Sequence, residues 1–292
     1  MKILITGKDG QVGYALNQQL KNEKSIETVA TSRNELDITE QVAVNSFVRE
    51  FCPDIIINCA AYTAVDQAEQ EPILANRINC DGPKHLAIAA KETGAQLIHL
   101  STDYVFDGTS ATPYTEETEA NPQSVYGKTK LAGEKAIADN LDKHIIIRTA
   151  WVFGEHGANF VKTMLRLALD RDELSIVADQ LGCPTYAADI AQTLIRIAKT
   201  ISSKPVDVYG IYNYAGVPHT NWYEFAEAIF TEAVKQNVLP KAPKVNAITT
   251  AEYPTPAKRP ANSRLECKKI ESVFNIQPAY WQNGLKNLKD YR

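Results

Sequence analysis

The first 150 residues alternate between short apolar runs and longer amphipathic segments. Near-continuous apolar runs rich in β-branched residues are typical of strands in a sheet that is covered on both faces. Such strands are expected at Lys2–Thr6, Ile26–Ala30, Asp54–Cys59, Gln96–Leu100 and His144–Thr149. Helices are expected between them at Gln11–Asn22, Thr39–Phe51, Pro83–Thr93 and Tyr126–Asn140. This alternation predicts an α/β fold with a doubly wound parallel sheet of the Rossmann type.

The pattern becomes less regular after residue 150. Helices are expected at Asn159–Leu169, Ala187–Lys199 and Trp222–Gln236, and strands at Leu174–Val177 and Gly210–Tyr214. The remainder is rich in proline. We therefore expect a Rossmann domain over residues 1–150, completed by late sheet elements from about 184–215. Residues 151–183 and 216–292 are expected to form a smaller, interleaved α/β lobe.

Composition and charge exclude several classes of protein. The formal net charge of −4 gives no global field that would recruit nucleic acid or a membrane surface. The chain has no apolar stretch long enough to span a bilayer, and the apolar run at its start is too short for a signal peptide. The five cysteines form no metal-site or redox spacing, and the five histidines are scattered. We therefore expect a cytoplasmic protein with free thiols and no metal.

A glycine-rich loop follows the first expected strand and opens the first expected helix. Gly7 permits the tight turn, Gly10 lets backbone amides approach a pyrophosphate, and Gly13 lets the helix pack close to the sheet. The helix N-terminus offers unpaired N–H groups to phosphates. This context favours dinucleotide binding over a plain strand–helix turn. The expected contacts are Gly7, Asp9, Gly10, Gln11, Val12 and Gly13.

The end of the second strand indicates which dinucleotide is bound. An acidic residue there would bind the ribose 2′-hydroxyl of NAD, but this chain has Ser32 and Arg33. A guanidinium suits a 2′-phosphate and can also stack on adenine. The alternative is an ordinary solvated arginine. NADPH is therefore the expected cofactor, with NADH possible, and Asp37 and Ile38 are expected to border the adenine.

Three further residues form a candidate catalytic set. Thr102 lies at the carboxyl end of the fourth strand, where ligands bind in this fold. Tyr126 and Lys130 are four apart and share one helical face. The ammonium should lower the phenol pKa from about 10 toward the working range, and Lys130 can also bind the nicotinamide ribose. A boundary tyrosine with a surface lysine is the alternative, but the order of the three motifs favours catalysis.

These residues resemble the extended short-chain dehydrogenase/reductase superfamily and, within it, the dTDP-4-dehydrorhamnose reductase family. The resemblance covers nearly the whole chain and includes the glycine loop. The other matching segments are Asn58–Asp66, Ser101–Phe106, Tyr126–Glu134, Arg148–Phe153, Asp179–Thr185 and Arg259–Leu265. It implies hydride transfer from NADPH to the C4 keto group of dTDP-4-dehydro-L-rhamnose, giving dTDP-L-rhamnose for polysaccharide biosynthesis. The smaller lobe would then bind the substrate.

The resemblance also implies roles for individual residues. Tyr126 would give a proton to the carbonyl oxygen, and Thr102 would orient that oxygen. The nicotinamide half of the cofactor would lie near Ala60, Ala61 and Thr63. The sugar pocket would be lined by Val65, Thr102, Asp103, Tyr104 and Trp151. Arg259 and Arg264 would face the diphosphate. Alternatively, Trp151 is a core aromatic at the domain boundary and the two arginines are surface residues.

One departure from the family concerns metal binding. Some members carry a glutamate two residues after the last loop glycine, as part of a magnesium-linked dimer contact, whereas this chain has Ala15. We therefore expect a monomer or homodimer without structural magnesium. Two rival functions remain open. One is a nucleotide-sugar epimerase or 4,6-dehydratase, although Tyr104 replaces the second acid expected of a dehydratase. The other is a non-catalytic regulatory subunit like that of methionine adenosyltransferase.

Overall fold

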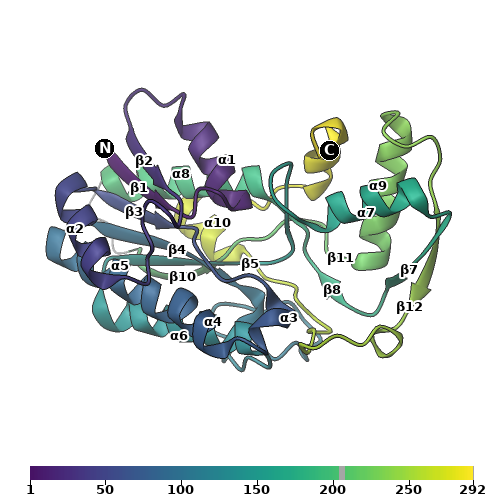
Figure 1. Cartoon of the computed structure of the whole chain (residues 1–292), viewed down its shortest axis with the longest axis horizontal. Helices are drawn as coiled ribbons and strands as arrows, with labels where there is room; N and C mark the ends of the chain where they lie inside the picture. Colours follow the sequence, from purple (N-terminus) through teal and green to yellow (C-terminus); the bar gives the residue numbers. More distant parts are fainter. Residues whose placement is uncertain (204–207, 292) are drawn as a thin grey trace.

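Six parallel strands form the central sheet of the larger lobe (Figure 1). The computed structural model describes residues 1–203 and 208–291. The strand order is β10-β5-β4-β3-β1-β2, and every pairing is parallel. The bounds are β1 Lys2–Thr6, β2 Glu27–Thr31, β3 Ile55–Asn58, β4 Gln96–Thr102, β5 His144–Thr149 and β10 Gly210–Asn213. The predicted Rossmann-type sheet is thus confirmed.

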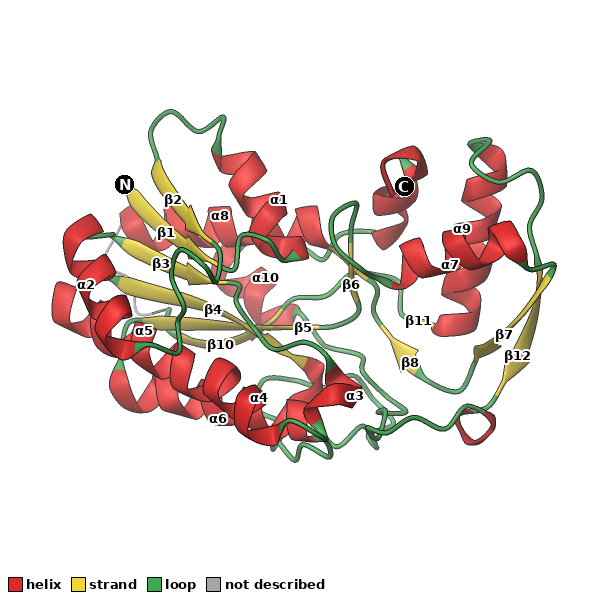
Figure 2. Ribbon diagram, viewed as in Figure 1, coloured by secondary structure: helices red, strands yellow, loops and turns green. Residues whose placement is uncertain are grey.

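Helices cover both faces of this sheet (Figure 2). One layer comprises α1 Gln11–Leu20, α8 Ala187–Ser203 and α10 Lys268–Phe274, and the other α2 Gln41–Phe51, α5 Gly82–Thr93 and α6 Val125–Asn140. Alternate strand residues serve the two layers, because successive side chains point to opposite faces. Ile3 and Ile5 pack with the first layer and Leu4 with the second. Among the described residues, no helix is both long and apolar enough to cross a membrane.

The sheet has its switch point between β1 and β3. From β1 the chain moves outward to β2, then returns to β3 on the other side of β1. Connections therefore diverge at the carboxyl ends of β1 and β3, which creates the crevice where ligands bind in such folds. Beyond β3 lie three short elements that the sequence pattern did not predict: α3 Val65–Ala68, α4 Pro72–Asn76 and the π-helical segment η1 Arg77–Asp81.

The smaller lobe packs two helices against a separate parallel strand pair. These elements are α7 Phe160–Asp170, α9 Trp222–Lys235, β7 Glu173–Val177 and β12 Lys244–Ile248 (Figure 1). Their own core includes Phe153, Val161, Phe225, Ile229 and Leu285. Two short pairs complete the strands, β6 Val152–Phe153 with β9 Thr185–Tyr186 and β8 Leu181–Gly182 with β11 Thr220–Asn221. The 3₁₀ turns are η2 Asp103–Val105, η3 Thr250–Glu252, η4 Trp281–Leu285 and η5 Leu288–Tyr291.

The C-terminal region changes the expected division into lobes. Ile270 and Phe274 of α10 belong to the same core cluster as Ile5, so this helix packs on the central sheet. We therefore propose that α10 belongs to the Rossmann domain, although it lies inside the range 216–292 expected for the smaller lobe. Residues 204–207 and 292, within the expected ranges 184–215 and 216–292, lie outside the described residues.

Candidate active site

The glycine loop lies at the switch point of the sheet. Gly7 has a φ of +76°, and a Cβ there would lie 2.5 Å from the backbone nitrogen of Ala60. Only glycine therefore fits between β1 and the segment after β3. The N–H groups of Gly7 and Lys8 donate to the carbonyl of Thr31 at 2.9 and 3.0 Å. These bonds tie the loop to the end of β2, so the ends of three strands meet here.

The N-terminus of α1 fits the pyrophosphate of a dinucleotide. No side chain caps this helix, and its first turn holds no acidic residue, so its N–H groups and dipole are available to an anion. The Gln11 side chain donates to the Val152 carbonyl at 3.3 Å and accepts from Asn159 at 3.1 Å. Val12 is buried, and Asp9 accepts from His156 through its carbonyl oxygen. Gln11 and Val12 are therefore placed to contact a cofactor through their backbone.

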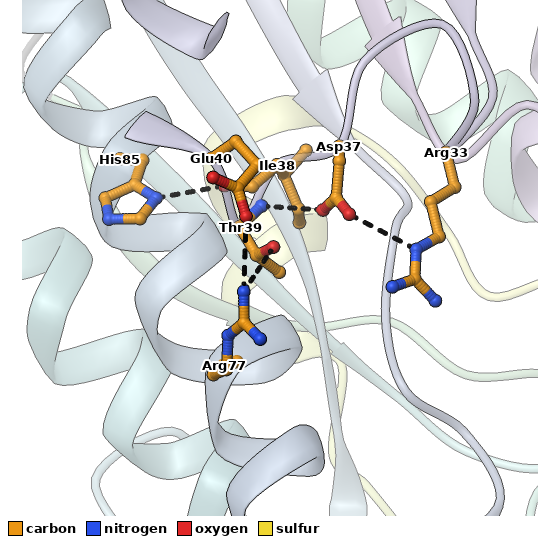
Figure 3. A network of polar contacts seen from close by, with 7 residues as sticks. All are labelled: Arg33, Asp37, Ile38, Thr39, Glu40, Arg77 and His85. Carbon is orange, nitrogen blue, oxygen red and sulfur yellow. Dashed lines mark hydrogen bonds and ion pairs between the residues drawn. The ribbon is translucent and has the colours of Figure 1, made fainter. Parts of the chain in front are cut away.

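Arg33 lies on the loop after β2, where the adenosine ribose is expected (Figure 3). Its side chain is 69% exposed, and its Nε lies 3.3 Å from Asp37 Oδ2. Asp37 also accepts from the Thr39 N–H at 2.9 Å. Figure 3 shows the two terminal nitrogens of Arg33 directed away from Asp37. Ile38 is buried, and its carbonyl lies 3.0 Å from His85 Nδ1, so the Ile38 side chain is part of the core.

A carboxylate that the sequence reasoning missed lies at the same end of the crevice. Glu35 accepts from the N–H and the hydroxyl of Ser32, both at 2.7 Å, and pairs with Lys8 of the glycine loop at 2.6 Å. The pKa of Glu35 is lowered to about 2, first by Lys8 and then by Ser32. The Ser-x-x-Glu spacing was a usable signal, because it is typical of a carboxylate that reaches back to a serine N–H.

Helix α6 brings Tyr126 to the carboxyl end of β4. Ser124 caps the helix by accepting from the Gly127 N–H at 3.1 Å. A Cβ on Gly127 would lie 2.2 Å from the Tyr104 carbonyl oxygen, so glycine permits α6 to approach the turn that follows β4. The rings of Tyr104 and Tyr126 meet edge to face with centroids 5.4 Å apart. Thr102, the last residue of β4, is close enough to hydrogen-bond the Tyr126 hydroxyl.

The electrostatics of Tyr126 and Lys130 differ from the expectation. Burial raises the pKa of Tyr126 and lowers the pKa of Lys130 to about 8. Lys130 Nζ donates to the Leu100 carbonyl at 2.7 Å and lies 3.2 Å from His99 Nε2. The expected lowering of the Tyr126 pKa is therefore wrong for this arrangement, because desolvation by burial is the largest influence on the phenol. Tyr126 is a neutral phenol that can donate a proton.

The segment after β4 supplies polar groups to the same region. Asp103 is buried; its Oδ1 accepts from the Thr102 hydroxyl at 3.1 Å, and its Oδ2 has no hydrogen-bond partner among the described residues. Burial raises the Asp103 pKa to about 6. Arg259 arrives from the C-terminal region, donating to the Tyr104 hydroxyl at 2.9 Å and pairing with Asp66 at 2.6 Å. The structure thus groups Thr102, Asp103, Tyr104 and Arg259.

Two other residues predicted to bind substrate are held by structural contacts. Trp151 stacks on Trp222 with ring centroids 3.5 Å apart and has a φ of +47°. Arg264 donates to Asn262 at 2.8 Å and to the Ala111 carbonyl at 2.7 Å, so its contacts differ from those of Arg259. The remaining predicted residues lie between the end of β3 and the start of α3: Ala60, Ala61, Thr63 and Val65.

No metal site was expected. In the part of the chain that the structure describes, no three His, Cys, Asp or Glu residues are grouped to hold an ion. Ala15, a residue of α1, packs against the core and offers no ligand. The independence from magnesium stays a prediction.

Comparison with known proteins places this chain in a family. The family model described as RmlD substrate binding domain matches residues 1–291. The dTDP-4-dehydrorhamnose reductase of Aggregatibacter actinomycetemcomitans is 51% identical over 290 residues, which cover 99% of each chain. The Clostridium acetobutylicum enzyme of that name has a solved structure with 43% identity, TM-score 0.92 and 99% coverage of both chains. The Bacillus anthracis enzyme, solved in complex with NADP, has 38% identity, TM-score 0.89 and coverage of 98% of this chain and 97% of its own. The chain therefore belongs to the RmlD family, that of the dTDP-4-dehydrorhamnose reductases.

Proposed function

We propose that this protein is an NADPH-dependent reductase that converts dTDP-4-dehydro-L-rhamnose into dTDP-L-rhamnose. The observation that carries the proposal is the placement of Tyr126 and Thr102 at one end of β4, in the crevice that also holds the glycine loop. Relatives that match the full chain bear the name of this activity, and one of them binds NADP. The dTDP-linked sugar is accordingly the partner, in a biosynthetic route to deoxysugar polymers.

The chemistry requires a hydride on the substrate C4 and a proton on its oxygen. Bound NADPH supplies the hydride. Tyr126 donates its phenolic proton to the carbonyl oxygen, which becomes the new hydroxyl group. Thr102 turns its hydroxyl from Asp103 toward the same oxygen and orients it. Lys130 in its ammonium form stabilises the phenolate that remains and supplies the proton that restores the phenol.

The other proposed roles follow the geometry of the crevice. The backbone of Gly7, Gly10 and Gly13 and the start of α1 hold the pyrophosphate, and Arg33 contacts the adenosine 2′-phosphate. Arg259 faces the substrate diphosphate from the smaller lobe. Residues 1–150 with the late sheet elements bind the dinucleotide, and the smaller lobe binds the sugar nucleotide. The monomeric or homodimeric state and the cytoplasmic location remain predictions.

The test is NADPH oxidation by the purified protein with dTDP-4-dehydro-L-rhamnose, followed by identification of the product. Tyr126→Phe should reduce turnover by about 10²- to 10⁴-fold and leave NADPH binding close to wild type, because the ring still packs but has no proton to donate. Tyr280→Phe is the matched control, since Tyr280 is 65% exposed and lies outside the site. Sugar conversion without net NADPH consumption would indicate an epimerase. NADPH binding without any turnover would indicate a non-catalytic subunit.

A further inference from the structure

A chain of buried polar groups lies directly beneath Lys130. Thr6, Asn58 and His99 are cross-strand neighbours on β1, β3 and β4, and none of them is exposed. The Thr6 hydroxyl donates to Asn58 Oδ1 at 2.7 Å, and Asn58 Nδ2 lies 2.9 Å from His99 Nδ1. His99 Nε2 lies 3.2 Å from Lys130 Nζ. Since buried polar groups are costly unless they are paired, this chain needs a physical account.

Backbone geometry fixes the direction of the hydrogen bonds that join Thr6, Asn58 and His99. The Ala60 N–H lies 3.0 Å from Asn58 Oδ1, and a backbone N–H can only donate, so the amide oxygen must face it. Asn58 Nδ2 therefore faces His99 and donates to Nδ1. Burial, and secondarily Lys130, hold the pKa of His99 well below its usual range, so the ring is neutral. The single ring proton of His99 is consequently on Nε2.

The protonated Nε2 of His99 faces the amine of Lys130. An ammonium has three donors and no acceptor, whereas a neutral amine has one lone pair that can accept. We propose that His99 is a positioning residue for the reduction: the relay from Thr6 through Asn58 presents an N–H to Lys130 Nζ and favours its neutral amine over its ammonium. Lys130 still donates to the Leu100 carbonyl in either form. The effect of His99 on the reaction rests on the proposed function, whereas the tautomer of its ring does not depend on that function.

The other charged groups around Lys130 act in both directions. Burial lowers its pKa, while Glu134, one turn further along α6, and Cys59, after β3, raise it. The effect of Glu134 is shared, because its carboxylate also pairs with Arg148 of β5 at 2.7 Å. Together these opposing effects lower the pKa of Lys130 to about 8. Below that pH the ammonium predominates and supports the Tyr126 phenolate, and above it the amine predominates.

The relay gives Lys130 a defined part in the reaction cycle. After Tyr126 has given its proton to the substrate, an N–H bond of the Lys130 ammonium breaks and the O–H bond of Tyr126 re-forms. The resulting amine then accepts from His99, and solvent returns the lost proton to Lys130. An ordinary lysine, with a pKa of about 10.4, would hold its proton more tightly and reset Tyr126 less readily.

The tautomer can be tested directly on the full chain without substrate or cofactor. Protein labelled with ¹⁵N at histidine should show a His99 ring that is protonated on Nε2 and does not titrate between about pH 6 and pH 9. The resonances are identified by their loss in His99→Phe. A ring protonated on Nδ1, or one that titrates in this range, would overturn the proposal whatever the protein catalyses.

The consequence for Lys130 can be tested by the pH profile of kcat. In Asn58→Asp, the new carboxylate can only accept, so the His99 ring should carry its proton on Nδ1 and face the Lys130 ammonium with Nε2 as an acceptor. In His99→Phe, the N–H group is removed altogether. In both variants the alkaline limb of kcat should move upward by about one pH unit, the effect of one hydrogen bond on a pKa. His144→Phe, at the start of β5, is the matched control and should leave the limb unchanged, because the His144 ring meets the Leu141 carbonyl and takes no part in the hydrogen-bonded chain to Lys130. A lower kcat with an unmoved limb in both test variants would reduce His99 to a structural residue.

Discussion

At the residue scale, we expect the choice of cofactor to depend on one exposed cation, Arg33, which lies near a carboxylate that is already paired. Glu35 is already paired with Lys8, and Arg33 after β2 directs its terminal nitrogens away from Asp37 (Figure 3). Arg33→Ala should raise the KM for NADPH about 10- to 100-fold and barely change that for NADH, because a charge-assisted hydrogen bond contributes roughly 1.5–3 kcal/mol. Steady-state kinetics at fixed low salt, with exposed Arg171→Ala as control, measures this. Equal losses for both cofactors would indicate stacking on adenine instead.

Asp103 should make stability depend on pH with a defined sign. Burial raises its pKa from 3.8 to about 6, so the folded protein binds this proton more tightly than the unfolded chain. The carboxyl is neutral in both states below pH 3.8, and folding is increasingly penalised as pH rises through 6. Asp103→Asn should therefore increase the free energy of unfolding by about 1–3 kcal/mol at pH 8 and by much less at pH 4. Urea denaturation at both pH values measures this, and an equal change at both would contradict it.

At the element scale, a buried ion pair joins helix α6 to the sheet. Glu134 accepts from Arg148 Nε at 3.0 Å and Nη2 at 2.7 Å and from the Ser101 hydroxyl. Glu134→Gln should lower the free energy of unfolding by about 3–5 kcal/mol, because it leaves the Arg148 charge buried without a counterion. Glu92→Gln breaks an exposed pair with Arg49 and should cost no more than about 1 kcal/mol. Urea denaturation compares the two variants, and similar losses would show that the buried pair has no special role.

Some helices and strands could be predicted from the sequence and others could not. The strand Lys2–Thr6 was predicted with its observed bounds, because a run buried on both faces has a strong apolar signal. Strand β12 and helix α10 were not predicted, since β12 lies in a proline-rich region with a weak apolar pattern and α10 has only seven residues. The proline-rich composition of the last fifty residues therefore gave no indication of this strand and this helix.

In the candidate site, likewise, local sequence patterns predicted some residues and could not predict others. Thr102, Tyr126 and Lys130 could be proposed together because a strand end and a helical spacing of four are local patterns. His99 could not be connected to Lys130, because that contact depends on the position of α6 against β4. The pairing of Lys8 with Glu35 likewise depends on two strand ends meeting in space. Local periodicity carries no information on such contacts.

At the scale of the whole molecule, two sets of polar contacts join the lobes across the crevice. Gln11 bonds to Val152 and Asn159 on the cofactor side. On the substrate side, Arg259 pairs with Asp66 of α3, and Figure 1 shows α3 beside the yellow-green chain that follows β12. Each contact joins residues more than 140 positions apart, so these bonds connect the two lobes at two separate places. The nucleotide sugar would then bind between them.

The last prediction separates the two arginines that the family resemblance assigns to the diphosphate. Arg259 reaches Tyr104 beside Tyr126, whereas Arg264 is bound to Asn262 and to the Ala111 carbonyl. Arg259→Ala should therefore raise the KM for the nucleotide sugar about 10- to 100-fold with NADPH binding unchanged, since it removes a charge-assisted contact to phosphate. Arg264→Ala is the matched comparison and should change this KM much less. Initial rates at varied sugar concentration and saturating NADPH measure both, and an equal rise would place both guanidinium groups at the diphosphate.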